Sequence, residues 1–473
     1  MSVRDSLLPL DDVLRAVHGK VLGLAHNTRN FCFTSVVTDS RNVAPGALFV
    51  PLVGSSQDGH SFIPAAMAAG ARAAFVQKDA YEKNPPYFMG LISRHSDGVF
   101  IIVEQNMRAL QDLARFYLLR FPGLVRVGVT GSSGKTTTRQ LISAVLAQKY
   151  SVVSTEGNLN SETGLPLSIF AVRPEHEIGV FEMGMNRRNE MYELSRVLRP
   201  CVGVVTNIGS AHIGRLGSRQ RIAEEKKHIF DYFDEQSVAV LPHDDDFTPF
   251  LLEGVAGKRL YFGADTERIH FIADMGLDGT VFSVDGVEVA LALPGSHNYR
   301  DAQAAVVLGL ELGLTARQIK AGIESVRALF GRSQILRGKY TLIQDCYNAN
   351  PDSMEKAIDM CCSAQSSAKK WLVLGDMLEL GDDAHLAHGS ILRKAARSSA
   401  HKIFCVGAEF MACGQEMADS GHIAFFPESD DDAMRSIAAC IETEAGAGDI
   451  ILVKGSRSMG LERVCAQLEV HGA

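Results

Sequence analysis

Hydrophobic positions in the middle of the 473-residue chain gather into short continuous runs, and stretches with helical spacing separate these runs. The runs at 124–130 (LVRVGVT), 177–183 (EIGVFEM) and 201–208 (CVGVVTNI) lack polar alternation, which is typical of parallel strands buried on both faces. Residues 136–150 and 187–198 repeat apolar positions with the helical period. This order of strand and helix predicts a doubly wound α/β domain.

The same alternation continues toward both ends of the chain. Further strands are expected at 46–52, 72–77, 340–348, 369–377, 401–407 and 449–456. Further helices are expected at 62–71, 107–121, 301–313, 316–326, 353–363 and 384–399. The turn-rich stretch 258–293 predicts a small appended sheet or a hairpin layer. At roughly 100–200 residues per domain the length supports three domains, which we expect at 1–122, 123–331 and 332–473.

Composition narrows the classes of protein that fit. A net charge of −8 gives no global attraction to nucleic acid or to a membrane surface, so an anionic substrate needs local Lys and Arg. The nine cysteines are scattered without C-x-x-C spacing, which argues against a zinc ribbon and a disulfide framework and favours reduced thiols in a cytoplasm. Asp5, Asp11 and Asp12 interrupt the first apolar stretch, and no run of 18 apolar residues follows. We therefore expect neither a secretory signal nor a membrane-inserted segment.

The stretch TGSSGKTT at 130–137 lies between the expected strand at 124–130 and the expected helix. The common P-loop pattern would need a glycine five positions before Gly134, and this chain has Val129 there. The context still predicts a phosphate site, because backbone amides and a helix N-terminus attract an anion. Lys135 would reach the β- and γ-phosphates, and the Thr136 hydroxyl would hold Mg²⁺. The alternative is a glycine-rich turn that only caps a helix.

Polar residues at other strand ends are candidates for the same site. Glu182 ends an apolar strand, where it is either a second Mg²⁺ ligand or a capping or ion-paired glutamate. His212 follows the next strand, although a lone histidine is more often structural. Lys226 lies in a charged helical stretch, and its local charge pattern alone favours a solvent-exposed helix face. Asn298 either caps a helix or binds a base, and Asp345 at a strand end suits a ribose hydroxyl.

The order of motifs along essentially the whole chain resembles one family, the ATP-dependent Mur ligases of peptidoglycan synthesis. The matching stretches are TDSR, GALFVPL, DGHSFIPAA, TGSSGKTT, EGNLNSETGLP, FEMG, NIGSAHI, EEKKHIF, GSHN, GRS and DCYNANPDSM. The resemblance implies an α/β protein with a central P-loop ATPase-like domain. A uridine-nucleotide-binding α/β domain would precede it and a Rossmann-like domain would follow it. It also implies an amide ligase that joins D-alanyl-D-alanine to UDP-N-acetylmuramoyl-tripeptide through an acyl phosphate. The Asp-Asn-Pro-Arg motif of the diaminopimelate-adding members does not occur here.

The resemblance also implies a role for each candidate residue. The UDP substrate would contact Ser40, Arg41, Asn158 and Asn160. ATP would be held by Thr130, Gly131, Ser132, Ser133, Gly134, Lys135, Thr136 and Thr137, and by Asn298, Arg332 and Asp345. Two Mg²⁺ ions would be held by Thr136, Glu182, His212 and a carbamylated Lys226. The catalytic residues would be Lys135, Glu182, His212 and Lys226. The dipeptide would lie near Asn348, Asn350, Lys454, Ser456 and Arg457.

Two departures from the family pattern bear on these roles. Relatives often carry asparagine where this chain has Asp301, which affects the adenine side of the site. The segment MNRRNEM after FEMG replaces a common Gly-Glu-Ile ending, which affects the muramyl-peptide side. The alternatives are another amide ligase, such as a tripeptide or folylpolyglutamate synthase, and a P-loop regulatory ATPase. The expected partners are small-molecule substrates, with no nucleic acid, and the expected state is a monomer.

Overall fold

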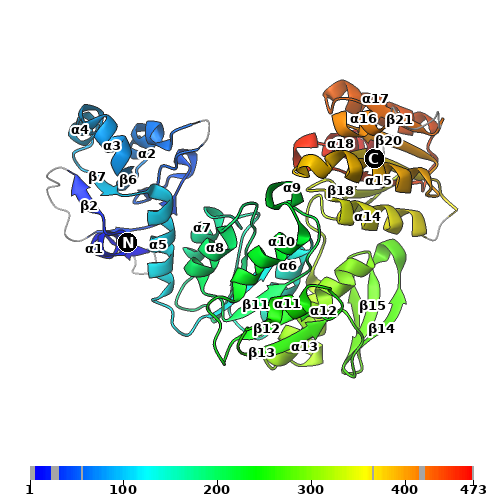
Figure 1. Cartoon of the computed structure of the whole chain (residues 1–473), viewed down its shortest axis with the longest axis horizontal. Helices are drawn as coiled ribbons and strands as arrows, with labels where there is room; N and C mark the ends of the chain where they lie inside the picture. Colours follow the sequence, from blue (N-terminus) through cyan, green and yellow to red (C-terminus); the bar gives the residue numbers. More distant parts are fainter. Residues whose placement is uncertain (1–5, 23–30, 55–56, 365–366, 415–420, 471–473) are drawn as a thin grey trace. The chain divides into compact units, whose positions relative to one another are not determined.

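The computed structural model describes residues 6–22, 31–54, 57–364, 367–414 and 421–470 (Figure 1). The chain divides into two compact units. The first contains residues 1–128, 151–185 and 190–201, and the second contains 129–150, 186–189 and 202–473. The three domain boundaries expected from the sequence stay predictions. No helix within the described ranges combines the length and apolarity needed to cross a bilayer.

The first unit begins with a five-stranded sheet of order β2-β7-β6-β5-β4. Strands β4 to β7 are parallel, and β2 is an antiparallel edge. Phe49, Ala74, Val76 and Phe100 fill the core on one face together with residues of α2 and α4. The bounds are β1 Leu8–Pro9, α1 Leu10–Val17, β2 Lys20–Leu22, β3 Cys32–Phe33, β4 Val36–Val37, β5 Leu48–Phe49, α2 Ile63–Ala68, β6 Ala73–Gln77, α3 Lys78–Lys83, α4 Pro85–Arg94, β7 Val99–Val103 and α5 Asn106–Leu118.

The first unit also holds the first residues of β8 and the strand pair β9–β10, which is parallel. Every residue of β10 is buried, as the unbroken apolar run predicted. Helices α7 and α8 complete this part. The bounds are β8 Val125–Thr130, β9 Val152–Ser154, α7 Gly164–Ile169, β10 Ile178–Glu182 and α8 Glu190–Leu198.

The second unit contains the end of β8, which β11, β12 and β13 follow in sheet order. Strands β11 and β12 pair in parallel, and so do β12 and β13. Helices α6, α12 and α13 pack together beside it (Figure 1). The bounds are α6 Lys135–Leu146, β11 Val202–Val205, α9 Ile213–Leu216, α10 Arg219–Lys227, β12 Val238–Pro242, α11 Thr248–Leu252, β13 Lys258–Phe262, α12 Ser296–Glu311 and α13 Ala316–Ser325.

The stretch 258–293 is only partly an appended sheet. Residues 269–291 form the antiparallel strands β14 (Ile269–Asp274), β15 (Thr280–Val284) and β16 (Val287–Leu291), as expected. Residues 258–262 instead form β13, the edge of the parallel sheet, so that part of the prediction is wrong. The reason is exposure: β13 is mostly exposed, and an edge strand lacks the continuous apolar run of an inner strand.

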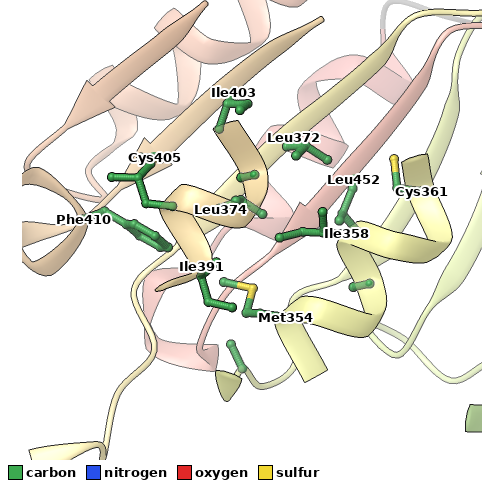
Figure 2. Packing of buried hydrophobic residues seen from close by; sticks show 14 of the residues in the cluster. Met354, Ile358, Cys361, Leu372, Leu374, Ile391, Ile403, Cys405, Phe410 and Leu452 are labelled. Carbon is green, nitrogen blue, oxygen red and sulfur yellow. The ribbon is translucent and has the colours of Figure 1, made fainter. Parts of the chain in front are cut away.

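A further six-stranded sheet, of order β17-β18-β22-β19-β20-β21, lies in the C-terminal part of the second unit. All its pairs are parallel except the edge pair β17–β18. Figure 2 shows one face, where Met354 and Ile358 of α14 and Ile391 of α15 pack on Leu372 and Leu452. Helices α17 and α18 cover the opposite face. The bounds are β17 Gln334–Arg337, β18 Thr341–Asp345, α14 Pro351–Ser363, β19 Lys370–Gly375, α15 Ala384–Ala396, β20 Lys402–Val406, α16 Ala408–Gly414, β21 Ile423–Phe426, α17 Asp431–Glu444, β22 Ile450–Lys454 and α18 Glu462–Val470.

Candidate active site

The predicted phosphate loop connects the end of β8 to the first residue of α6. Gly131 and Gly134 have φ values of 150° and 80°, which side-chain-bearing residues rarely adopt. A Cβ at Gly131 would lie 1.8 Å from Oγ1 of Thr206, and one at Gly134 would lie 2.6 Å from Oδ1 of Asp301. Glycine is therefore required at both positions for the loop to pack against its neighbours.

Residues after β11 hold the loop in place. Thr206 Oγ1 donates to the Ser133 carbonyl at 2.5 Å, and the Gly209 amide donates to Ser132 Oγ at 2.9 Å. The amides of Ser132 and Ser133 donate to the backbone and side-chain oxygens of Asn207, each at 3.1 Å. These bonds fix the loop without a ligand, so its shape is preorganised.

Two lysine ammonium groups converge on the loop. Lys135 Nζ and Lys226 Nζ each donate to the Gly131 carbonyl at 2.9 Å. Lys226 is only 1% exposed, so the solvent-facing position that its local sequence favours is wrong. Helix α10 turns Lys226 inward together with Ile222 and Ala223. Two positive charges beside a glycine loop suit a polyphosphate better than any neutral ligand.

Asp301 lies under the loop, with its carboxyl group against Gly134. It is 6% exposed, and burial raises its pKa to about 8 despite the nearby charges of Lys356 and Arg300. At neutral pH the group is therefore mostly a neutral acid. In that state it presents an uncharged carboxyl group to the phosphate loop.

His212 is the first residue before α9 and has a φ of 64°. Its Nδ1 lies 2.7 Å from Oε2 of Glu379. Burial lowers the pKa of His212, with smaller contributions from Lys135 and Lys226, although the bond to Glu379 opposes this effect. The imidazole is thus neutral at pH 7, which is the form that binds metals.

Glu379 was not singled out from the sequence. It lies in the loop after β19, 167 residues from His212 along the chain, and its own φ is 67°. Arg215 approaches its other carboxylate oxygen at 3.4 Å. Its only local signal is its place in the strand-end loop LGDMLELG at 374–381, and nothing in that stretch distinguishes it from its neighbours.

The loop after β18, expected near the dipeptide, packs on the phosphate-loop region. Asn350 caps α14 by accepting from the Ser353 amide at 2.9 Å, and its Nδ2 donates to Ser133 Oγ at 3.3 Å. Asp352 Oδ2 accepts from the amide and the hydroxyl of Ser210 at 2.9 and 3.0 Å. Asn348 accepts from the amide of the following residue. These contacts bring the C-terminal sheet's loop to the nucleotide side of the second unit.

The remaining candidates of the second unit lie on neighbouring loops. Lys454 is 2% exposed in its side chain and pairs with Asp345 at 2.7 Å. Ser456 Oγ accepts from the Leu378 amide at 2.9 Å. Arg457 pairs with Glu462 at 2.6 Å, Arg332 stacks over the Tyr347 ring at 4.1 Å, and Asn298 donates to the Pro294 carbonyl at 2.7 Å. Asp345 and Lys454, expected on ATP and on the dipeptide, thus contact each other.

The first unit holds the other candidates. Glu182 ends β10, is 1% exposed, and accepts from Asn160 Nδ2 at 2.7 Å. Asn158 is exposed, and its carbonyl accepts from the Asn160 amide at 2.8 Å. Asn160, expected on the muramoyl part, therefore contacts the predicted metal ligand.

Ser40 and Arg41 form a short 3-10 turn in the first unit, capped by Asp39. The Arg41 guanidinium hydrogen-bonds the Asp39 carboxylate, which lowers the pKa of Asp39 to about 2. Arg41 itself is largely exposed, with 87% of its side chain accessible. An exposed, ionised turn of this kind is open to a polar ligand.

The described residues contain no group of three or more His, Cys, Asp or Glu side chains arranged for a metal ion. A nucleotide-bound Mg²⁺ needs only one or two protein ligands, because phosphates and water supply the rest. Thr136, 4% exposed at the start of α6, is placed beside the loop for that purpose. The residues present therefore fit Mg²⁺ that is held partly by phosphate groups, and not a metal held by protein side chains alone.

A glycine loop between strand and helix, with two lysines at its first carbonyl, defines a P-loop-type nucleotide-binding protein. Family models described as "Mur ligase family, catalytic domain", "Mur ligase middle domain" and "Mur ligase, glutamate ligase domain" match residues 33–117, 129–309 and 331–457. The chain belongs to the Mur ligase family. The family resemblance and the three-domain α/β fold expected from the sequence are thereby confirmed.

Full-length relatives agree with this assignment. The UDP-N-acetylmuramoyl-tripeptide--D-alanyl-D-alanine ligase of Treponema pallidum (strain Nichols) is 42% identical, covering 97% of this chain and 98% of its own. A crystal structure of MurF from Acinetobacter baumannii superposes with a TM-score of 0.85 at 27% identity, covering 98% and 99%. The structure of the Thermotoga maritima MurF ligase in complex with ADP gives 0.77 at 29% identity, covering 92% and 97%.

Proposed function

We propose that this chain is an ATP-dependent ligase that joins D-alanyl-D-alanine to the terminal carboxylate of UDP-N-acetylmuramoyl-tripeptide. The observation that carries the substrate assignment is the 42% identity over 97% of the chain to a ligase of that name. The phosphate loop and Lys135 support ATP as the energy source.

The chemistry follows from the charges at the loop. The substrate carboxylate attacks the γ-phosphate of ATP, ADP leaves, and an acyl phosphate forms. Lys135 offsets the negative charge that the transferring phosphoryl group brings to the loop. The dipeptide amine then attacks the acyl carbon, loses a proton and expels inorganic phosphate. Mg²⁺ held by Thr136 would supply positive charge that lowers the repulsion between the two anions.

Two ions are part of the proposal. Thr136 would ligate the Mg²⁺ ion bound to ATP, and Glu182 is the predicted second protein ligand of the same ion. His212 and Lys226 would support the other ion, with Lys226 as a carbamate formed from its neutral amine and CO₂ with release of one proton. The position of Lys226 supports this, because its side chain is buried beside the phosphate loop, with Nζ 2.9 Å from the Gly131 carbonyl. Bicarbonate labelled with ¹³C should give a carbamate resonance that Lys226→Ala lacks, and acetate should partly restore the variant's activity.

The remaining substrate contacts are also proposals. Ser40 and Arg41 would bind the uridine diphosphate, and Asn158 the muramoyl part. The nine cysteines of the sequence, none of which is disulfide-bonded, support action in a reducing cytoplasm. A monomer is expected, and sedimentation with and without substrates tests it.

The decisive assay measures ADP release with UDP-N-acetylmuramoyl-tripeptide and either D-alanyl-D-alanine or a free diamino acid. Turnover is expected only with the dipeptide. A carboxylate labelled with ¹⁸O should transfer one label to inorganic phosphate, because the bridging oxygen of the acyl phosphate leaves with it. Turnover with the diamino acid alone would assign another ligase of the family, and ADP release without any amine would favour a regulatory ATPase.

A further inference from the structure

We propose that Glu379 is a positioning residue that orients His212, so that the loop after β19 completes the metal-binding side of the phosphate site. This inference rests on the proposed function, because it takes His212 to be a metal ligand. It adds a residue from the C-terminal sheet to a site otherwise built on the residues around the phosphate loop.

The first observation is the contact itself. Glu379 Oε2 lies 2.7 Å from Nδ1 of His212, which places the proton of a neutral imidazole on Nδ1. The lone pair is then on Nε2. Metal-binding histidines usually donate their other ring N–H to a carboxylate or a carbonyl, and this partner fixes both tautomer and ring orientation.

The second observation is backbone strain on both sides of the contact. His212 and Glu379 both have positive φ values, 64° and 67°, although neither is glycine. Non-glycine residues in this region are strained and persist only where the surrounding structure imposes them, most often at functional sites. A surface ion pair would not need two strained partners.

The third observation is how tightly the two loops meet. A Cβ at Gly214 would lie 2.3 Å from the Gly381 amide nitrogen, so the backbones touch where only glycine fits. Arg215 approaches Oε1 of Glu379 at 3.4 Å and restrains the second carboxylate oxygen. Glu379 is therefore held by its neighbours as well as by His212.

The test uses three variants of the full chain. Glu379→Gln keeps an acceptor oxygen, Glu379→Asp shortens the side chain, and Glu379→Ala removes it. Asp382→Asn is the matched control, because it removes an exposed charge three residues away. The first readout is the ¹⁵N spectrum of histidine-labelled protein without nucleotide, with the His212 signals assigned by their loss in His212→Gln.

We expect the Nδ1-protonated tautomer in the wild-type chain, in Glu379→Gln and in the control, and a mixture of tautomers in Glu379→Ala. The second readout is Mn²⁺ affinity in the presence of a non-hydrolysable ATP analogue, followed by electron paramagnetic resonance. Glu379→Ala should weaken it by about 10–100-fold, with Glu379→Asp between Ala and Gln. An unchanged tautomer and Mn²⁺ affinity in Glu379→Ala, with only a lower melting temperature, would overturn the proposal.

The two levels of inference fail separately. If the wild-type chain does not join the dipeptide, the proposed function fails, yet the tautomer measurement still decides whether Glu379 orients His212. If ligation proceeds while Glu379→Ala leaves the tautomer and the metal affinity unchanged, only the positioning role fails.

Discussion

Replacing Asp301 by asparagine is expected to stabilise the protein at neutral pH and to remove a pH dependence of its stability. The side chain is 6% exposed and lies against Gly134 in the phosphate loop. Burial raises its pKa from 3.8 to about 8. Asparagine has nearly the same shape and carries no charge, so Asp301→Asn removes the cost of keeping the acid protonated.

The sign follows from where the proton is bound. Below the unfolded pKa, both states of Asp301 are protonated and the residue has no effect on the pH dependence. Between the unfolded and folded values only the folded state holds the proton, so stability falls as pH rises. Above about pH 8 both states are ionised and the loss levels off.

The size follows from the same shift. At about 1.4 kcal/mol per unit, the shift of about four units limits the loss to about 6 kcal/mol, of which about 4 kcal/mol is reached by pH 7. Asp301→Asn should therefore gain a few kcal/mol at pH 7, and its advantage should grow by about 1.4 kcal/mol per pH unit between pH 4 and 8.

Hydrogen–deuterium exchange of peptides from α6 and α12 measures this locally, since Asp301 lies on α12 and faces the start of α6. Protection should fall with pH in the wild-type chain, after correction for intrinsic exchange, and stay level in Asp301→Asn. Asp97→Asn, at an exposed position, is the control and should follow the wild type. Parallel profiles for wild type and Asp301→Asn from pH 5 to 8 would refute a protonated Asp301.

Two further predictions concern the loop and the C-terminal sheet. Gly131→Ala should lower the rate of ADP release by about 100-fold, because the added Cβ displaces the loop by the order of 1 Å. The control Gly90→Ala lies in a helix with open space and should instead stabilise the protein by about 0.5–1 kcal/mol. A normal rate for Gly131→Ala would contradict the packing argument. Lys454→Met should cost about 3–5 kcal/mol by leaving a carboxylate unpaired. Urea unfolding followed by the fluorescence of the single tryptophan, Trp371, measures this loss of stability. The control Arg435→Met removes one partner of an exposed ion pair and should have little effect. Equal losses of stability in Lys454→Met and Arg435→Met would contradict the burial argument.

Local features of the chain were predictable because they depend on residues close in sequence. The strand, glycine loop and helix at 125–146 needed only an apolar run, two glycines and a helical period. An appended antiparallel sheet was predicted over residues 258–293, but the first five residues of that stretch form β13 of the parallel sheet. Edge strands are the hardest to assign, because they are partly exposed and carry a weak pattern.

Contacts between distant segments were not predictable from local pattern. Lys226 lies in a stretch of charged residues, and only the packing of α10 shows that its side chain is buried on Gly131. Glu379 reaches His212 across 167 residues, and Asp352 reaches Ser210 across 142. The family resemblance identified Lys226 through its motif, but no local rule distinguishes Glu379 from other acids in strand-end loops.

The loop that follows β11 links these observations. Its residues hold the phosphate loop through Thr206 and Gly209, and Ser210 and His212 contact the C-terminal sheet's loops. The contacts to the phosphate loop and to the C-terminal sheet's loops therefore lie within one segment of seven residues, 206–212. The segment expected to receive the dipeptide is the one that supplies Asp352 to this contact. If the dipeptide binds at that segment as proposed, we expect its binding to be coupled to the alignment of the nucleotide through these contacts.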